Sequence, residues 1–298
     1  MVKNIGEIAA LGTALCWSIG PIFFTIASRS VGANLVNRTR LVLTLILLII
    51  THLILFGKFL PTNASLTVWF WFGLSGIIGF TVGDTFLFNA FVLIGPRLAS
   101  LLMSLAPIFG TTIAWLFLKE ILIWQKILAI IITLTGVSWV VLEQRNEGQT
   151  YPNYFKGIMF GLGAAIGQAL GLFFSKKGLA NNFPALSGNL IRILIATITI
   201  WLIPIFQGGA VDSIKKLQAN AKAQLGILGG AIFGPYLGVW LSLIAVQKTY
   251  IGIASTLMAL PPIFLLPLSH WIFKEKITFR AVIWTIIAII GVALIFLL

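Results

Sequence analysis

The chain has 298 residues, of which 59% are hydrophobic and only 9% charged, and its mean hydropathy is +1.06. A soluble domain carries about 25% charged residues, so this chain cannot cover its surface in water and its hydrophobic excess must face lipid. The net charge of +13 does not indicate nucleic-acid binding, because the basic residues stand singly or in pairs between long apolar runs.

Ten apolar runs are each about as long as a bilayer-crossing helix requires. They cover residues 5–27, 34–56, 67–94, 99–118, 122–143, 155–177, 185–206, 223–247, 252–273 and 278–297. The first run resembles a signal peptide, but Glu7 interrupts its start and it has a counterpart later in the chain, so we predict a spanning helix. The polar segment 207–224 predicts a short amphipathic helix at the membrane interface.

The two halves of the sequence repeat each other. Residues separated by 155 positions match in type, and with a slightly smaller separation the match extends to the start of each half. The matched pairs are Gly79 and Gly234, Gly83 and Gly238, Pro107 and Pro262, Lys119-Glu120 and Lys274-Glu275, Gly136 and Gly291, Trp17 and Gln168, Asn37 and Asn189, and Arg40 and Arg192. We therefore predict an all-α integral membrane protein with two five-helix repeats, residues 1–147 and 153–298.

An odd number of helices per repeat has a geometric consequence. The second copy must enter the membrane from the opposite side, so the repeats are inverted relative to each other. Inverted repeats are typical of secondary transporters, whose solute binds between the halves near the bilayer midplane.

The ordered motifs resemble the EamA-like branch of the drug/metabolite transporter superfamily. They are Trp17-Ser18-Ile19-Gly20, Arg40, Gly83-Asp84, Ala90, Gly95, the run from Ala99-Ser100 to Pro107, Leu118-Lys119-Glu120 and Gly136-Val137, with Ala254-Ser255, Pro262, Phe273-Lys274-Glu275 and Gly291-Val292 in the second copy. The resemblance implies a ten-helix exporter or importer of small metabolites with both termini cytoplasmic. The distribution of Lys and Arg favours the opposite orientation.

Asp84 is the most informative single residue. It is predicted near the middle of the third span, where a carboxylate costs about 2.5–3.5 kcal/mol. Its counterpart in the second repeat is Val239, so the packing of the repeat does not require an acid there. We predict that Asp84 contacts a substrate ammonium group or exchanges a proton; the alternative is a hydrogen-bonded Asp at a local kink beside Gly83.

Two arginines and three further residues complete the candidate site. Arg40 and Arg192 pair with Asp84, attract an anionic substrate, or extend to the lipid headgroups, and we favour the last of these interpretations. Trp17, Gln168 and Tyr236 are predicted to shape the pocket between the halves, with helix packing as the alternative.

Other sequence features indicate structure. Glycines at four-residue spacing, such as Gly226, Gly230, Gly234 and Gly238, favour close helix packing. Glu120 and Glu275 precede predicted spans and are expected to stabilise helix N-termini. His52 and His270 are expected near the membrane surfaces.

We predict a secondary transporter of small metabolites that works by alternating access and is open to proton coupling. A protease is disfavoured, because Gly73-Leu74-Ser75-Gly76 lacks a histidine predicted at the same depth, so we expect no enzyme. A receptor or scaffold protein without transport activity is the alternative. The expected partners are a small solute and the lipid bilayer, with a homodimer left open, and no nucleic acid, metal or cofactor; the expected location is the plasma or inner membrane as a multi-pass protein.

Overall fold

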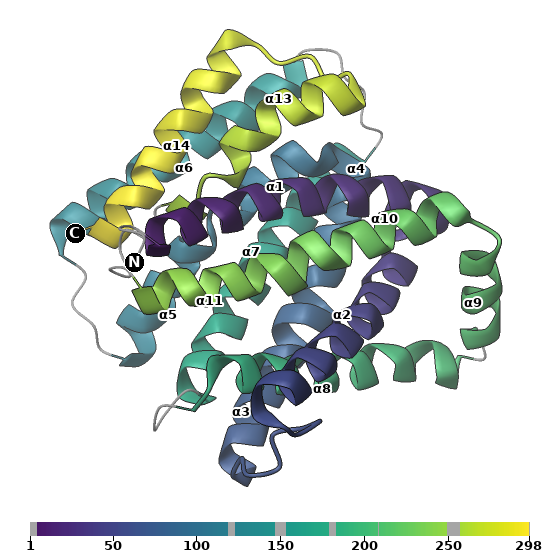
Figure 1. Cartoon of the computed structure of the whole chain (residues 1–298). Coiled ribbons are helices and arrows are strands. Elements are labelled where there is room, and N and C mark those ends of the chain that lie inside the picture. Colours follow the sequence, from purple (N-terminus) through teal and green to yellow (C-terminus); the bar gives the residue numbers. More distant parts are fainter. Residues whose placement is uncertain are drawn as a thin grey trace.

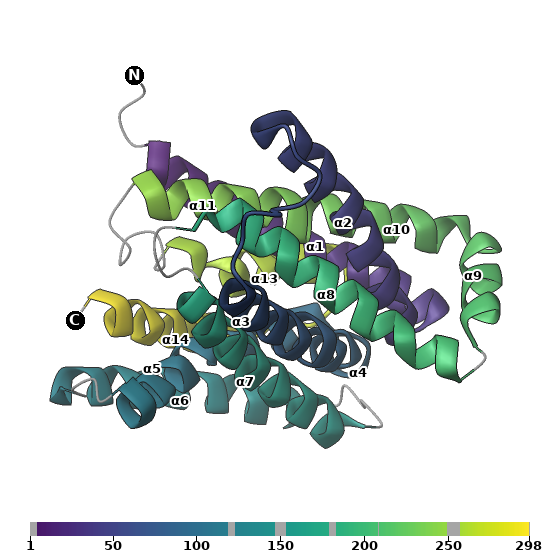
Figure 2. The same ribbon diagram turned by 90° about the horizontal axis from the view of Figure 1, so that it is seen from below.

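The chain folds into packed helices, and no strand occurs among the described residues (Figures 1 and 2). The structure is a computed structural model that describes residues 5–118, 123–146, 153–178, 183–207, 209–248 and 257–297. Its helices are α1 (Ile5–Val31), α2 (Ala33–Phe56), α3 (Leu66–Gly76), η1 (Ile77–Gly83), α4 (Asp84–Met103), α5 (Ala106–Leu118), α6 (Trp124–Asn146), α7 (Tyr154–Gly178), α8 (Ala185–Phe206), α9 (Ala210–Gln218), α10 (Ala221–Ala231), η3 (Ile232–Gly238), α11 (Val239–Lys248), α13 (Pro261–Phe273) and α14 (Phe279–Leu297).

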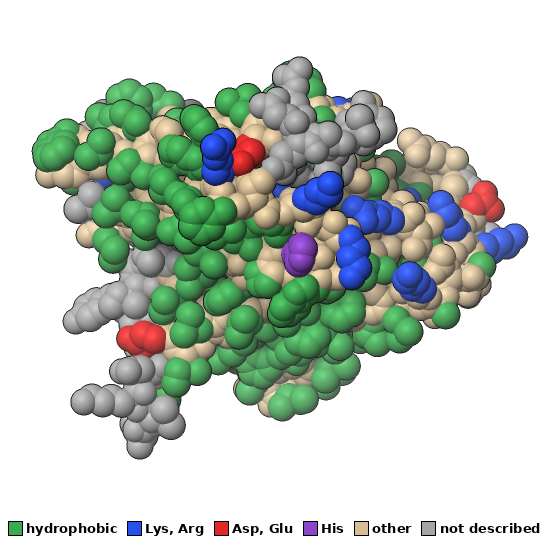
Figure 3. All heavy atoms as spheres, turned by 90° about the horizontal axis from the view of Figure 1, so that it is seen from above, with side chains coloured by type: hydrophobic (Ala, Val, Ile, Leu, Met, Phe, Trp, Pro, Cys, Tyr) green, Lys and Arg blue, Asp and Glu red, His purple; other side chains and the backbone are tan. Residues whose placement is uncertain are grey.

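The helices have the length and surface of a membrane protein. Seven segments of the described chain are long and apolar enough to cross a bilayer, and two shorter apolar helices follow near the C-terminus. Large hydrophobic side chains such as Leu66 and Phe206, 88% and 84% exposed, point outward where water would disfavour them. Figure 3 shows this broad apolar surface, with most of the visible basic side chains in the right half of the view. The multi-span membrane class is therefore confirmed.

Two predicted spans differ from the observed helices. The predicted run 99–118 is divided between the end of α4 and α5, because the chain turns at Ser104 and Leu105. Within α4 the chain also bends at Gly95, whose φ of 78° suits glycine, and Pro96 follows with the fixed φ that can start a new helix. In the predicted run 252–273, helix α13 begins at Pro261, and residues 249–256 lie outside the described part.

Two π-helical segments interrupt the long apolar helices, and the sequence analysis did not predict them. Segment η1 joins α3 to α4, and η3 joins α10 to α11. Single π-turns within α-helices are rare and often lie at functional sites. Here each segment lies at the centre of a composite helix.

The internal repeat is visible in the structure. The bounds of α3, η1 and α5 recur 155 positions later as those of α10, η3 and α13. Helix α1 packs against α10, η3 and α11, and its counterpart α7 packs against α3, η1 and α4. The glycine contacts are equally reciprocal, because a Cβ added to Gly20 would lie 3.3 Å from Gly234, and one added to Gly171 would lie 3.1 Å from Gly79. Equivalent helices of the two halves therefore exchange equivalent contacts.

Candidate functional site

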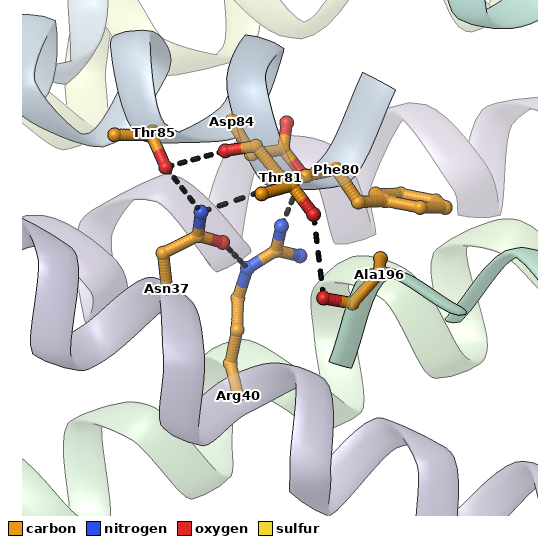
Figure 4. A network of polar contacts seen from close by, with 7 residues as sticks. All are labelled: Asn37, Arg40, Phe80, Thr81, Asp84, Thr85 and Ala196. Atoms are coloured by element: carbon orange, nitrogen blue, oxygen red, sulfur yellow. Dashed lines mark hydrogen bonds and ion pairs between the residues drawn. The ribbon is translucent and has the colours of Figure 1, made fainter. Parts of the chain in front are cut away.

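The central polar cluster begins with an ion pair between α2 and α4. Asp84 is the first residue of α4, immediately after η1, and its carboxylate accepts a hydrogen bond from the Arg40 guanidinium (Figure 4). The two side chains are 13% and 4% exposed. Arg40 Nε also donates to Asn37 Oδ1 at 3.0 Å. The expectation that Arg40 extends to the headgroups is therefore wrong: a closer and better partner lies inside the bundle.

Asn37 connects this pair to the backbone of η1. Its Nδ2 donates to the Phe80 carbonyl oxygen at 3.2 Å and to Thr85 Oγ1 at 3.1 Å. Thr81 Oγ1 donates to the Ala196 carbonyl oxygen of α8 at 3.3 Å, as Figure 4 shows. The cluster thus joins α2 and α4 of the first repeat to α8 of the second.

Aromatic rings surround the Arg40 guanidinium. The Arg40 Cζ atom lies 4.8 Å from the centroid of the Phe88 ring, 5.5 Å from that of Phe24 and 6.0 Å from that of Phe80. Ring faces attract a cation, more strongly where water is excluded. The rings and Asp84 together compensate for burying the positive charge.

Arg192 lies on the other side of Phe80. Its Cζ atom is 4.6 Å from the centroid of the Phe80 ring, and it interacts electrostatically with Asp84. Among the described residues, neither Arg192 Nε nor the two side-chain polar atoms of Asn189 has a hydrogen-bond partner, although these atoms are buried. Asn189 lies one helical turn before Arg192, so both face the same region.

A polar cavity opens beside the cluster. It has a volume of about 310 Å³ and lies where α1, α2, α4 and α9 meet. Its lining includes Gly32, Asn34, Arg38, Asn89, Asp212 and Lys216. Asn89 Nδ2 donates to the Thr85 carbonyl oxygen at 2.7 Å, so the cavity lies one turn of α4 from the residue that Asn37 contacts.

The opposite end of the cluster is closed. Tyr236 of η3 shares a hydrogen bond with Thr51 of α2, with 3.0 Å between their oxygens. His52 Nε2 lies 3.0 Å from Ser187 Oγ, and His52 Nδ1 lies 2.6 Å from the Lys58 carbonyl oxygen. His52 is only 2% exposed and so is buried within the protein, while its depth in the membrane stays a prediction.

A narrow crevice, too small for a water molecule, lies on this side. It is lined by Leu48, Leu186, Asn189, Tyr236, Val239 and Trp240. Asn189, one helical turn from Arg192, therefore lies at this crevice.

Trp17 and Gln168 lie in the contacts between the repeats. A Cβ added to Gly238 would lie 2.5 Å from the Trp17 indole nitrogen, so Trp17 packs directly on η3. Gln168 follows Gly167, which packs in the same way on Gly83 beside Asp84. Neither side chain lines the two cavities described above. The sequence analysis did not propose Asn37 and Asn189 as site residues, although the match between these two asparagines offered a signal.

Glu275 has a role other than the one expected. It lies before α14, but its Oε2 accepts a hydrogen bond from Arg97 Nε at 3.1 Å, and both side chains are 5% exposed. It therefore forms a buried ion pair with the first repeat, and the interpretation as a helix cap is wrong. Glu120 lies outside the described residues.

Comparisons with known proteins agree with this architecture. The sequence profile of the EamA-like transporter family matches residues 4–142 and again 155–297, nearly the whole chain. The chain belongs to the EamA-like transporter family. This membrane transporter is similar to an uncharacterized transporter of Archaeoglobus fulgidus, with 26% identity over 217 residues, 73% of this chain and 74% of the relative.

A solved crystal structure shares the fold. It covers 100% of this chain and 99% of its own, with a TM-score of 0.63 and 17% identity. The likeness supports the fold alone at that identity. The predicted resemblance to the EamA-like family is thus confirmed, and membership of a transporter family agrees with the expectation that the chain is not an enzyme.

Proposed function

We propose that this transporter moves a small polar solute by alternating access, along a path between its two inverted repeats. The observation that carries the proposal is the Arg40–Asp84 pair, which lies between an open polar cavity and a closed crevice. Buried ion pairs in transmembrane segments mark substrate and proton pathways.

The proposed path uses polar groups from both repeats. A solute enters the cavity at Asn34 and Asn89, reaches the ion pair, and leaves past Asn189 and Tyr236. In the arrangement described, the second part of the path is shut by the Thr51–Tyr236 and His52–Ser187 contacts. Rocking of the halves would break these contacts and close the cavity at the other end, which is the alternating-access mechanism of inverted repeats.

Asp84 is proposed as the residue that couples binding to movement. A solute group or a proton that reaches Asp84 competes with the Arg40 guanidinium for the same carboxylate. Releasing Arg40 loosens the contact of α2 with α4 and so links occupancy of the site to the packing of helices. Trp17 and Gln168 are proposed to line the site when the halves move, because each lies beside a π-helix.

Flux measurements in proteoliposomes test the proposal. We expect uptake or counterflow of at least one solute from a panel of metabolites, dependent on protein and on the external pH. Asp84→Asn should abolish the flux or remove its pH dependence. Glu143→Gln is the matched control, because Glu143 lies away from the path and an amide can still accept the hydrogen bond from Thr278.

The result that refutes the role of Asp84 is unchanged flux in Asp84→Asn at every pH. Absence of flux for all solutes, with folded protein in the vesicles, would instead favour a receptor or scaffold protein.

A further inference from the structure

The second repeat retains the basic and amide residues of the central cluster but not the acid. Arg192 and Asn189 match Arg40 and Asn37, whereas Val239 stands where Asp84 stands in the first repeat. Arg40 is paired with a carboxylate and an amide oxygen. Arg192 Nε and both polar atoms of Asn189 are buried without a hydrogen-bond partner among the described residues.

Burying these polar atoms without hydrogen-bond partners lowers the stability of the folded protein. A buried polar group without a partner costs about 1–3 kcal/mol, and a charged one costs more. Asn189 is only 4% exposed, so water in contact with the bulk does not relieve the cost. The missing partner has defined chemistry: it must accept a hydrogen bond from Arg192 Nε and carry the charge that Val239 does not provide.

The charges along the path favour an anion. The centre holds the guanidinium groups of Arg40 and Arg192 against the single carboxylate of Asp84. The cavity that leads to it holds Arg38 and Lys216 against the single carboxylate of Asp212. A path with excess positive charge at both places attracts anions and repels cations.

We propose that Arg192 and Asn189 form a binding subsite for the oxyanion group, a carboxylate or a phosphate, of the transported solute. The crevice at Asn189 is too narrow for a water molecule in the arrangement described, so the subsite opens when the halves move apart. A guanidinium presents its donors in a planar fork that matches these groups, and the Asn189 amide adds a further donor. The Arg192 Cζ atom lies 4.6 Å from the centroid of the Phe80 ring, and this cation–π contact favours a guanidinium beside the ring. The inference rests on the proposed function, because the oxyanion belongs to the solute that moves along the path.

Binding to the purified protein in detergent tests the subsite. The probes are acetate, benzoate and phosphate, with acetamide and benzamide as neutral analogues and ethylamine as a cation, all at constant ionic strength. We expect at least one oxyanion to raise the unfolding temperature with saturable concentration dependence, because a ligand of the folded state stabilises it. The amides and the amine should have no such effect.

Substitutions locate the effect. Arg192→Gln should weaken binding by roughly tenfold or more, the effect of one lost charged hydrogen bond. Arg280→Gln removes the same charge from an exposed position of α14 and should leave binding unchanged. Equal stabilisation by amides and carboxylates, no stabilisation by any oxyanion, or unchanged binding in Arg192→Gln would overturn the proposal.

A second variant keeps the test decisive if Arg192→Gln does not fold. Val239 lines the crevice together with Asn189, so Val239→Asp places in the second repeat the carboxylate that Asp84 provides in the first. It should fill the subsite internally and abolish oxyanion binding, whereas Val239→Asn should retain it. If Val239→Asp binds oxyanions like the original protein, the subsite is not between these residues.

Transport distinguishes the two proposals. Flux of a neutral or cationic solute, without oxyanion binding, would leave the proposed function intact and refute the subsite. Oxyanion binding that Arg192→Gln removes, without flux of any solute, would support the subsite and refute transport.

Discussion

Burying the charged side chains of Asp84 and Arg40 costs free energy, and apolar side chains of similar volume could fill the same space at a lower cost. Moving an ion out of water costs several kcal/mol even after the protein relaxes, and buried pairs can often be replaced by apolar residues without loss of stability. Arg40 is nevertheless held by Asp84, by Asn37 and by three aromatic rings. Because stability alone does not require the pair, its presence favours a role in moving a solute.

The energetic coupling of the pair is testable. Asp84→Asn leaves a buried guanidinium without its counterion, and Arg40→Gln leaves a buried carboxylate, so each should cost about 3–5 kcal/mol of stability. The double variant should cost clearly less than the two single costs combined, because it strands neither charge. Unfolding of the four proteins in the same detergent measures this; additive costs would show that the two charges act independently.

Asp84 could be proposed as a candidate site residue from the sequence, but the sequence could not show that Arg40 is its ion-pair partner. An acid inside an apolar run is conspicuous, since few such residues occur and its counterpart is Val239. Hydropathy sets the approximate depth of Arg40 but not the rotation of its helix, and a long side chain at that depth can reach either headgroups or the interior. The choice between the two depended on the packing of α2 against α4.

The π-helical segments are the element-scale feature that the sequence did not reveal. Segment η3 contains Pro235, which disturbs an α-helix, but η1 has the same length without a proline. Both lie where glycines let a helix of the other repeat approach closely, as Gly83 meets Gly167. The glycine spacing predicted close packing, whereas the extra residue per turn depends on contacts between helices that are distant in sequence.

The contact between α6 and α14 allows an element-scale prediction. A Cβ added to Gly136 would lie 2.7 Å from the Ala288 nitrogen, and one added to Gly291 would lie 2.6 Å from the Thr133 nitrogen. Because backbone cannot move aside like a side chain, Gly136→Ala should separate the helices and lower stability by about 1–3 kcal/mol.

The control for this prediction is Gly110→Ala in α5. A Cβ at Gly110 meets no atom within 4 Å, so the same substitution should be neutral or raise stability by up to about 1 kcal/mol through helix propensity. Thermal unfolding compares the two variants. A loss in Gly110→Ala as large as that in Gly136→Ala would show that the contact is not responsible.

At the scale of the whole molecule, the repeat was the strongest inference from sequence. A separation of 155 residues, read from a few Gly, Pro and Lys-Glu pairs, also relates the observed bounds of α3, η1 and α5 to those of α10, η3 and α13. The access state could not be read from sequence. In the proposed mechanism it depends on which contacts between helices are formed, such as the Thr51–Tyr236 hydrogen bond.

The proposed inversion of the halves in the membrane can be tested by labelling equivalent positions. Asn63 and Gln218 are separated by the same 155 residues, and both are exposed. Asn63 lies shortly before α3, and Gln218 lies shortly before its counterpart α10. If the repeats are inverted, these equivalent positions lie on opposite faces of the membrane. Single cysteines are placed there in a Cys16→Ser background, which removes the chain's one native thiol.

In intact cells, a membrane-impermeant maleimide should label one of Asn63→Cys and Gln218→Cys, and label the other only after the membrane is opened. Thr62→Cys and Ala219→Cys provide neighbouring exposed positions, so that each face is reported twice from chain outside the long helices. Labelling of Asn63→Cys and Gln218→Cys from the same side would contradict the inversion. The path between the repeats would then lose its geometric basis, since two halves that face the same way cannot exchange inward and outward openings by symmetry.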